Sequence, residues 1–205
     1  INVNAAVVTS EQTQSTEYAT GNSTFTLNGD TLQIINGSDK IDLQVCDSEI
    51  LKVNYKPNGK SDEDTLIIDP NKTWGTGNIV SYDLDSDPAI IKTSKMIIKI
   101  SKSDLGISVY NSSNSLLLKQ TGYTSGGVTF NHNSGQNFYG ISALGNSNAS
   151  DTTLRTGTNA VFAGGQGHAG APFTWTTSGY GILVDSDGGN INIGDTSLSY
   201  TGISK

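Results

Sequence analysis

The stretch FTLNGDTLQIINGSDKIDLQV, residues 25–45, decides the fold of this chain. Apolar residues alternate with polar ones in three short runs, and a period of two places one face of a strand against a core. Asn28-Gly29 separates the first two runs and predicts a hairpin turn with positive φ at both central residues, and Asn36-Gly37 predicts a second turn. The stretch therefore predicts an antiparallel meander.

The same alternation continues along the chain, and no stretch repeats apolar residues at helical spacing for three turns. Residues 1–23 are expected to form an irregular lead-in or an edge strand. We therefore expect one all-β domain over residues 1–205, an antiparallel β-sandwich of two packed sheets. Further strands are predicted at 51–55, 96–100, 105–109, 116–118, 128–130, 138–141, 160–163, 173–177, 180–185, 191–193 and 198–200.

The composition excludes two classes of partner. The chain has 12 Lys and Arg against 19 Asp and Glu, and the basic residues form no cluster, so we expect no nucleic acid partner. No apolar run approaches the roughly 20 residues that cross a bilayer, so no membrane partner is expected either. The single Cys46 is predicted to be a small buried apolar residue. Few basic residues and many Asn and Thr are typical of a secreted, extracellular protein of a Gram-positive-type bacterium.

The segment GGQGHAG, residues 164–170, has the spacing G-x-G-x-x-G of a dinucleotide-binding loop. Such a loop needs a helix directly behind it, whose N-terminus meets the pyrophosphate. Residues 171–179 are instead rich in β-branched and aromatic types and end in a glycine, so they favour an extended chain. We therefore expect a glycine-rich loop between two strands and no nucleotide cofactor.

The sequence contains no clear metal-binding motif and no clear set of catalytic residues. The acidic loops at residues 83–87 and 185–190 could offer oxygen ligands to Ca²⁺, with Asp185 and Asp187 as the candidates, but turns are favoured because Asp bonds its own backbone. His132 and His168 lack a second ligand at zinc spacing. His168 is either a ligand-binding donor or a loop histidine without a role. No carboxylate pair suits glycosidase catalysis.

The segments Phe138-Tyr139-Gly140, Pro172-Phe173 and 179–185 (GYGILVD) appear in this order, and the chain resembles the N-terminal β-sandwich of glycoside hydrolase family 31. Upstream, residues 50–57 and 91–96 resemble two further strands of the family, so that the resemblance covers 31–187. The segment GGQGHAGAPF, residues 164–173, is most similar to the corresponding segment of bacterial members that transfer glucosyl or isomaltosyl units. The resemblance implies a supersandwich fold related to that of galactose mutarotase.

The resemblance also implies a function. The family's retaining chemistry belongs to two Asp residues of a (β/α)₈ barrel, so this chain would be the non-catalytic front domain that packs on that barrel. Its loop 154–171 would flank the site for an α-glucan oligosaccharide. Arg155, Asn159, Gln166 and His168 would then donate or accept hydrogen bonds with sugar hydroxyls.

Two other functions stay open. A mutarotase-like enzyme needs a late Glu beside a His, but no Glu follows Glu63. A stand-alone carbohydrate-binding module would present exposed aromatic rings, with Trp74 and Trp175 as candidates, although Trp175 is expected in the core.

Overall fold

The computed structural model describes residues 16–20, 23–61, 65, 67–69, 71–124, 126–141, 154–163, 173–186 and 188–203. These residues contain no α-helix, and every strand pair among them is antiparallel, which confirms the all-β prediction. The elements are β1 (Thr16–Thr20), β2 (Ser23–Asn28), β3 (Thr31–Asn36), β4 (Asp39–Asp47), β5 (Ile50–Lys56), the 3-10 turn η1 (Pro57–Gly59), β6 (Ser81–Asp83), β7 (Ala89–Lys92), β8 (Met96–Ile100), β9 (Ile107–Asn111), β10 (Leu116–Thr124), β11 (Gly127–Asn131), β12 (Phe138–Gly140), β13 (Thr158–Ala163), β14 (Phe173–Thr176), β15 (Tyr180–Leu183), β16 (Gly188–Ile193) and β17 (Ser197–Thr201).

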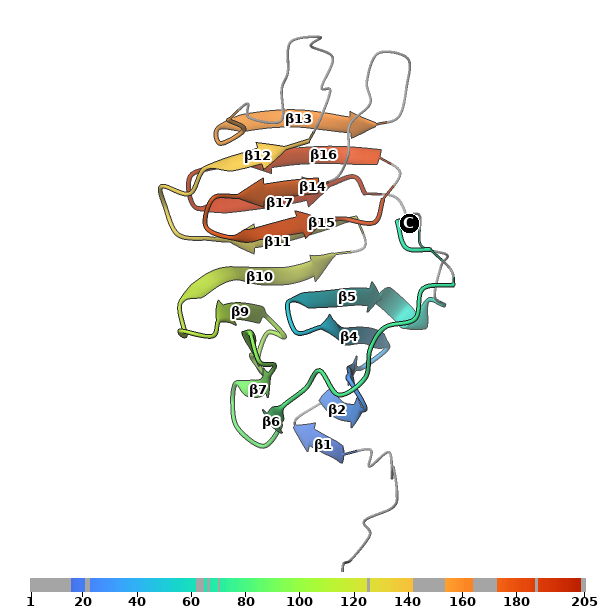
Figure 1. Ribbon diagram of the computed structural model, residues 1–205. Helices are drawn as coiled ribbons and strands as arrows, with labels where there is room; N and C mark the ends of the chain where they lie inside the picture. The colour runs from blue at the N-terminus through green and yellow to red at the C-terminus, as the bar shows by residue number, and fades with distance from the viewer. Residues whose placement is uncertain are drawn as a thin grey trace, which may run out of the picture.

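The strands form two layers (Figure 1). One layer is a nine-stranded sheet in the order β13-β16-β17-β11-β10-β9-β8-β7-β6. The other layer consists of a five-stranded sheet, β1 to β5, and a separate three-stranded sheet in the order β12-β14-β15. The sandwich is confirmed, but its second layer is divided into two sheets where one was expected.

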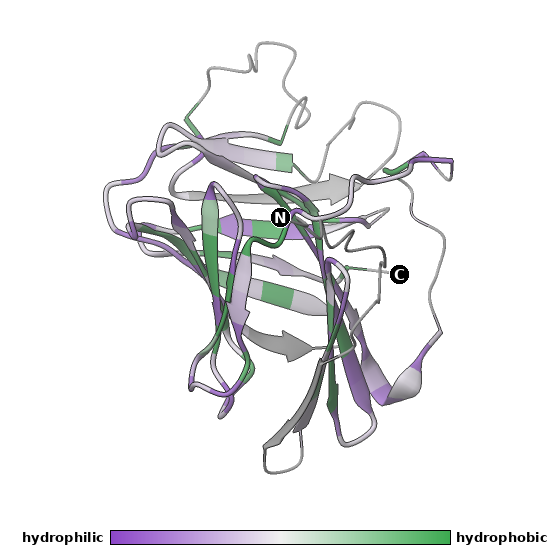
Figure 2. Ribbon diagram, turned by 60° about the horizontal axis from the view of Figure 1, so that its bottom comes forward, coloured by the Kyte–Doolittle hydropathy of each residue, from purple (hydrophilic) through white to green (hydrophobic). Residues whose placement is uncertain are grey.

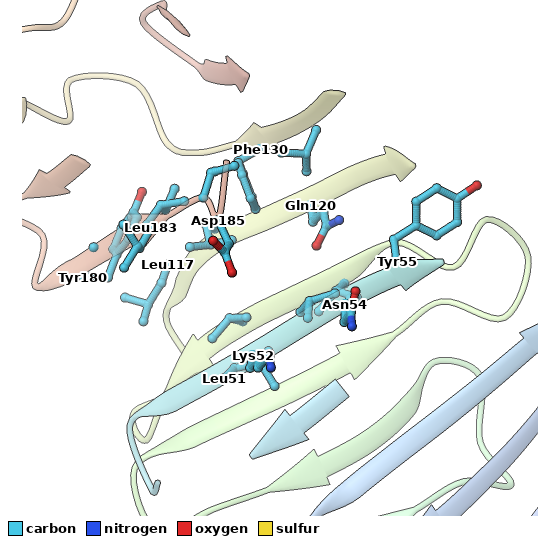
Figure 3. A pocket seen from close by; sticks show the side chains of 18 of the residues that line it. Leu51, Lys52, Asn54, Tyr55, Leu117, Gln120, Phe130, Tyr180, Leu183 and Asp185 are labelled. Atoms are coloured by element: carbon cyan, nitrogen blue, oxygen red, sulfur yellow. The ribbon is translucent and has the colours of Figure 1, made fainter. Parts of the chain in front are cut away.

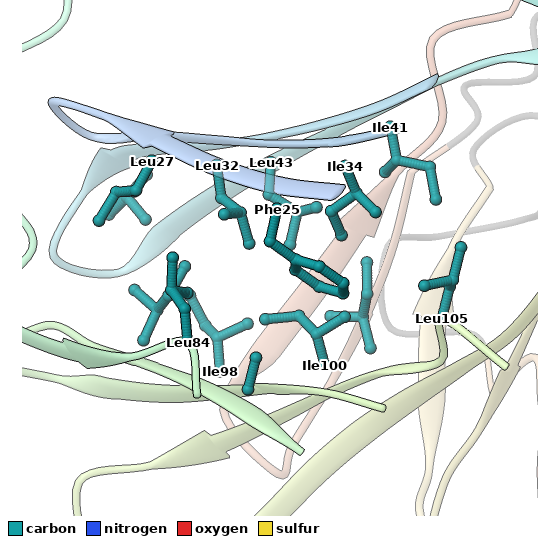
Figure 4. Packing of buried hydrophobic residues seen from close by; sticks show 14 of the residues in the cluster. Phe25, Leu27, Leu32, Ile34, Ile41, Leu43, Leu84, Ile98, Ile100 and Leu105 are labelled. Atoms are coloured by element: carbon teal, nitrogen blue, oxygen red, sulfur yellow. The ribbon is translucent and has the colours of Figure 1, made fainter. Parts of the chain in front are cut away.

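The first hydrophobic core lies between the five-stranded sheet and the β6–β9 half of the nine-stranded sheet. Phe25 and Ile34 meet Ile98 and Ile100 there, and all four side chains are fully buried (Figure 4). Hydrophobic and hydrophilic residues alternate along these strands, as Figure 2 shows. Leu118 of β10 contacts both this core and a second one under the three-stranded sheet, so β10 marks the boundary between them.

The meander is confirmed, with a correction to its first turn. Asn28 pairs with Thr31, so the central residues of the turn are Gly29 and Asp30. Only Gly29 has a positive φ, 56°, and the expectation of two left-handed residues is wrong. Asp30 is fixed differently, because its carboxylate accepts N–H bonds from Asn78 and Ile79, each at 3.0 Å.

Two of the expected strands also differ from the structure. The strand expected at 105–109 begins only at Ile107, because the backbone of Leu105 is left-handed, with a φ of 56°. The Leu105 side chain is nevertheless buried. Residues 91–96 contain a turn, since Thr93 Oγ1 accepts N–H bonds from Lys95 at 3.1 Å and Met96 at 2.8 Å and so separates β7 from β8. The short strand β6 was not predicted. Cys46 is buried as expected.

Candidate functional site at the three-stranded sheet

The three segments that resemble family 31 form one sheet. They become the neighbouring strands β12, β14 and β15, although the segment 142–172 stands between the first two in the sequence. Tyr139 lies opposite Trp175, and Trp175 lies opposite Gly181. The similarity of separate motifs therefore corresponds to a single structural unit.

Two glycines of these motifs allow the strands to approach each other. Gly140 has a φ of 98°, and a Cβ atom there would stand 2.5 Å from the carbonyl oxygen of Phe173. A Cβ atom on Gly181 would stand 2.8 Å from the ring of Phe173, which lies across the glycine. A side chain at either position would push Phe173 away. Gly140 of the Tyr-Gly pattern and the second glycine of the Gly-Tyr-Gly pattern are thus packing requirements, whereas an added Cβ atom on Gly179 would meet no described atom within 4 Å.

The inner face of the sheet is fixed by a buried hydroxyl pair. Thr174 and Tyr200 are both fully buried, and their hydroxyl oxygens lie 3.0 Å apart in a hydrogen bond. Burial raises the pKa of the Tyr200 phenol well above its ordinary value. The bond joins β14 to β17 of the opposite layer, so it holds the small sheet in place.

Phe138 anchors the same face from β12. It is buried and contacts the rings of Tyr180, in an edge-on arrangement, and of His132, at a centroid distance of 4.7 Å. His132 is itself buried, with Nδ1 bonded to the carbonyl oxygen of Asn133 and no partner for Nε2 in the described part of the chain. The ring packs as part of the core. No group of three His, Cys, Asp or Glu side chains suited to a metal ion occurs among the described residues.

The outer face carries aromatic and aliphatic side chains. Tyr139 stacks on Trp175, with ring centroids 4.7 Å apart and an interplanar angle of 25°. Phe173 and Leu183 are paired across β14 and β15, with 41% and 48% of their surfaces exposed. Trp175 is half-buried and alternates with the buried Thr174, so the prediction that it lies in the core is wrong. We call this set of four residues the outer apolar face.

Arg155 lies at the free edge of β12. Its amide donates to the carbonyl oxygen of Phe138 at 2.7 Å, and its Nε donates to that of Gly140 at 3.1 Å. Only 8% of the residue is exposed. Asn159 belongs to a different sheet, where its backbone in β13 pairs with Asn192. The structure therefore gives Arg155 a role in positioning the start of the 154–171 loop.

The remaining predicted site residues are only partly described. Gln166, His168 and Asp187 lie outside the described residues. Asp185 lies two residues after the end of β15. At the other acidic loop, Asp83 Oδ1 accepts N–H bonds from Asp85 and Ser86 at 3.0 and 3.1 Å, and these bonds lower the pKa of Asp83. The turn interpretation of residues 83–87 is confirmed.

The glycine-rich segment 164–170 also lies outside the described residues, but its flanks are known. β13 ends at Ala163, and the next described element, β14, begins at Phe173 as a strand. The prediction of a connection between two strands is confirmed at both ends. No helix in the described part of the chain is long and apolar enough to span a membrane.

The geometry defines a β-sandwich domain with an apolar outer face, and comparisons with known proteins identify relatives of this domain. No model of a known protein family matches the sequence. A 1,6-alpha-glucosyltransferase of Sporosarcina globispora is 38% identical over 168 residues, which are 78% of this chain and 13% of that protein. The chain therefore spans a small part of that relative's length.

Solved structures share the fold. A GH31 dextranase of Flavobacterium johnsoniae, complexed with isomaltotriose, matches 93% of this chain with 25% of its own, at a TM-score of 0.70 and 16% identity. A cycloalternan-forming enzyme of Listeria monocytogenes, in complex with a pentasaccharide substrate, matches 92% of this chain with 19% of its own, at a TM-score of 0.65 and 17% identity. The resemblance to the N-terminal β-sandwich domain of a glycoside hydrolase family 31 enzyme is confirmed.

Proposed function

We propose that this chain is the non-catalytic N-terminal domain of a larger family 31 α-glucosidase or α-glucosyltransferase that acts on α-glucans. The observation that carries the proposal is the 38% identity to a 1,6-alpha-glucosyltransferase over most of this chain and a small part of that protein. The catalytic Asp pair then belongs to a (β/α)₈ domain of the same polypeptide, outside residues 1–205.

The outer apolar face is the surface that we assign to contact with the catalytic domain. Side chains of Phe173 and Leu183 are too exposed to contribute to either core of the sandwich, and the Tyr139–Trp175 pair extends the apolar surface beside them. Contiguous exposed apolar surface of this kind marks an interaction site. Leu154, which precedes Arg155 at the edge of β12, is also 51% exposed.

The loop 154–171 is the part that we assign to the sugar site. Its first residues lie at the edge of β12, where Arg155 is bonded, and residues 158–163 form β13 of the nine-stranded sheet, so the part that we assign to the sugar is residues 164–171. Gln166 and His168 would bond sugar hydroxyls, with Asn159 near the base of the loop. The proposal also includes secretion, as expected for an enzyme whose substrates are extracellular polymers.

Variants of the larger enzyme test this assignment. Gln166→Ala and His168→Ala are expected to raise KM for panose or isomaltotriose, and to change the distribution of transfer products, because each removes a hydrogen bond to the substrate. Unchanged KM and product pattern in both variants would contradict the role of the loop.

A stand-alone carbohydrate-binding module is the second candidate, and the half-buried stacked pair Tyr139–Trp175 on the outer apolar face favours it. An aromatic platform would bind sugar without a catalytic domain. Titration of the isolated chain with maltose, isomaltose and panose, compared with the same titration of Trp175→Ala, separates the two functions. A strong affinity that disappears with Trp175 would support the module.

A further inference from the structure

A groove separates the two small sheets on the surface of the nine-stranded sheet (Figure 3). Its volume is about 1010 Å³, at the upper end of pockets that hold small organic ligands. The edge strands β5 and β15 form its two walls, and residues of β9, β10 and β11 form its floor. Leu183 of β15 lines this groove and also belongs to the outer apolar face, so the two surfaces meet at β15, while Tyr139, Phe173 and Trp175 lie outside the groove.

The floor of the groove is apolar. Leu117 and Leu118 of β10 lie beside Val128 and Phe130 of β11, and all four are only half-buried although they contact the two cores. A gap over apolar side chains between two otherwise complete cores leaves apolar surface in water, which costs free energy. A ligand with an apolar face would cover this surface.

Gln120 lies on the same floor and is its neutral polar side chain. Only 6% of the residue is exposed, yet its amide atoms are not among the buried polar atoms that lack a partner in the described part of the chain, so the amide reaches the space of the groove. Its carbonyl accepts and its NH₂ donates, so one ligand that carries adjacent donors and acceptors would satisfy both.

The charges around the groove favour a neutral ligand. Three lysines, Lys52, Lys60 and Lys95, line the groove together with the carboxylates Glu49 and Asp185, so both signs are present. The deeper cation is already paired, since Lys56 Nζ lies 2.7 Å from the Asp42 carboxylate. A phosphorylated or strongly acidic ligand would meet the carboxylates of Glu49 and Asp185 as well as these lysines, whereas a neutral ligand meets no like charge.

We propose that this groove binds a short α-glucan, with hydroxyls of one glucosyl unit on the Gln120 amide and the C–H face of a ring on Leu117 and Phe130. A saccharide combines the neutral charge, the paired donors and acceptors and the apolar ring face that these residues require. The choice of α-glucan over other glycans rests on the proposed function. The groove would then give the domain a saccharide site separate from the one that the 154–171 loop flanks.

Isothermal titration and ¹H–¹⁵N NMR of the 205-residue chain with isomaltotriose, panose and maltotriose test the proposal. We expect saturable binding and shifts of the amide signals of Leu117, Gln120 and Phe130. Gln120→Leu should weaken binding by about tenfold or more, the loss of hydrogen bonds worth about 1.4 kcal/mol. It should leave the thermal midpoint of the free chain close to that of the wild type, because no side-chain hydrogen bond within the described part of the chain is removed.

Gln44→Leu is the matched control. Gln44 is half-buried on β4, on the face of the sheet away from the core and outside the groove, so this variant should keep the wild-type affinity. If Gln120→Leu does not fold, the amide shifts of the wild-type chain decide between the outcomes. The absence of such shifts at saturating glucan, or equal affinity of a folded Gln120→Leu chain, would overturn the groove assignment.

Cellotriose and xylotriose distinguish this failure from a failure of the proposed function. Preference of the groove for either of these would overturn the α-glucan assignment of the groove but not the substrate class proposed for the larger enzyme, which rests on the identity to the glucosyltransferase. A groove that binds no oligosaccharide overturns only the groove assignment, since the loop variants Gln166→Ala and His168→Ala test the proposed function independently.

Discussion

Tyr139 and Trp175 lie opposite each other on β12 and β14, and their rings stack with centroids 4.7 Å apart. The pair covers the strand junction at which the chain is most constrained, because Gly140 follows Tyr139 directly and contacts the backbone of Phe173. The stacked rings and the close backbone contact together define how the small sheet presents its outer apolar face.

Gly140→Ala is expected to destabilise the domain strongly. The added Cβ atom would stand 2.5 Å from a carbonyl oxygen, and φ at this position is 98°. Strain of this kind costs about 1 to 3 kcal/mol. Gly135→Ala is the control, since Gly135 has a φ of 76° but an added Cβ atom would meet no described atom within 4 Å. Urea unfolding should show the larger loss for Gly140→Ala; equal losses would show that the contact with Phe173 is unimportant.

The hydroxyl bond between Thr174 and Tyr200 is expected to couple the small sheet to the nine-stranded sheet. Tyr200→Phe should lower the free energy of unfolding by about 1 to 2 kcal/mol, because the buried Thr174 hydroxyl loses its partner. Thr174→Val in the Tyr200→Phe background should cost less than Thr174→Val alone. Additive losses in this double-mutant cycle would argue against the coupling.

A charge placed on the outer apolar face is expected to weaken its contact with the catalytic domain in the larger enzyme. Leu183→Asp and Ile50→Asp form a matched pair, since both native side chains are 48% exposed and only Leu183 lies on that face. In the larger enzyme, Leu183→Asp should separate the unfolding of the two domains in calorimetry and increase proteolysis between them. The same behaviour with Ile50→Asp would remove the reason for choosing this face.

The pH dependence of stability is expected to include a contribution from Asp104. The Ser101 side chain and the Gly106 amide donate to its carboxylate and lower its pKa in the folded state. A lowered folded pKa means that the contribution is complete above the unfolded value of about 3.9 and is lost as the pH falls through the folded pKa. Asp104→Asn should therefore be less stable than the wild type at pH 7, with a difference that shrinks below about pH 4 in urea unfolding. If the free energies of unfolding of Asp104→Asn and the wild type differed by the same amount at pH 7 and below about pH 4, this linkage would be excluded.

Local patterns were sufficient to predict much of the fold. The alternation of residues 25–45 predicts β2, β3 and most of β4, because period-two burial is a property of neighbouring residues. The positions of Leu105 and the turn at Thr93 could not be predicted this way. Leu105 reaches the core with a left-handed backbone, and Thr93 turns the chain through hydrogen bonds of its side chain, neither of which changes the apolar pattern.

Less of the candidate site than of the fold could be predicted from the sequence. Family-like motifs pointed to β12, β14 and β15, but the outward direction of Trp175 depends on which face of β14 the buried Thr174 occupies. The groove depends on the division of one layer into two sheets, which brings Gln120 and Phe130 between β5 and β15. Such a division arises from pairings far apart in sequence, and no local signal at Gln120 indicates it.

Turnover of α-glucans by the 205-residue chain alone tests the central claim most directly. Incubated with panose and with isomaltotriose, the purified chain is predicted to release no glucose and to form no transfer products, while the larger enzyme does one or both. Glucose release or glucosyl transfer by the isolated chain, at a rate proportional to its concentration, would contradict its assignment as the non-catalytic domain.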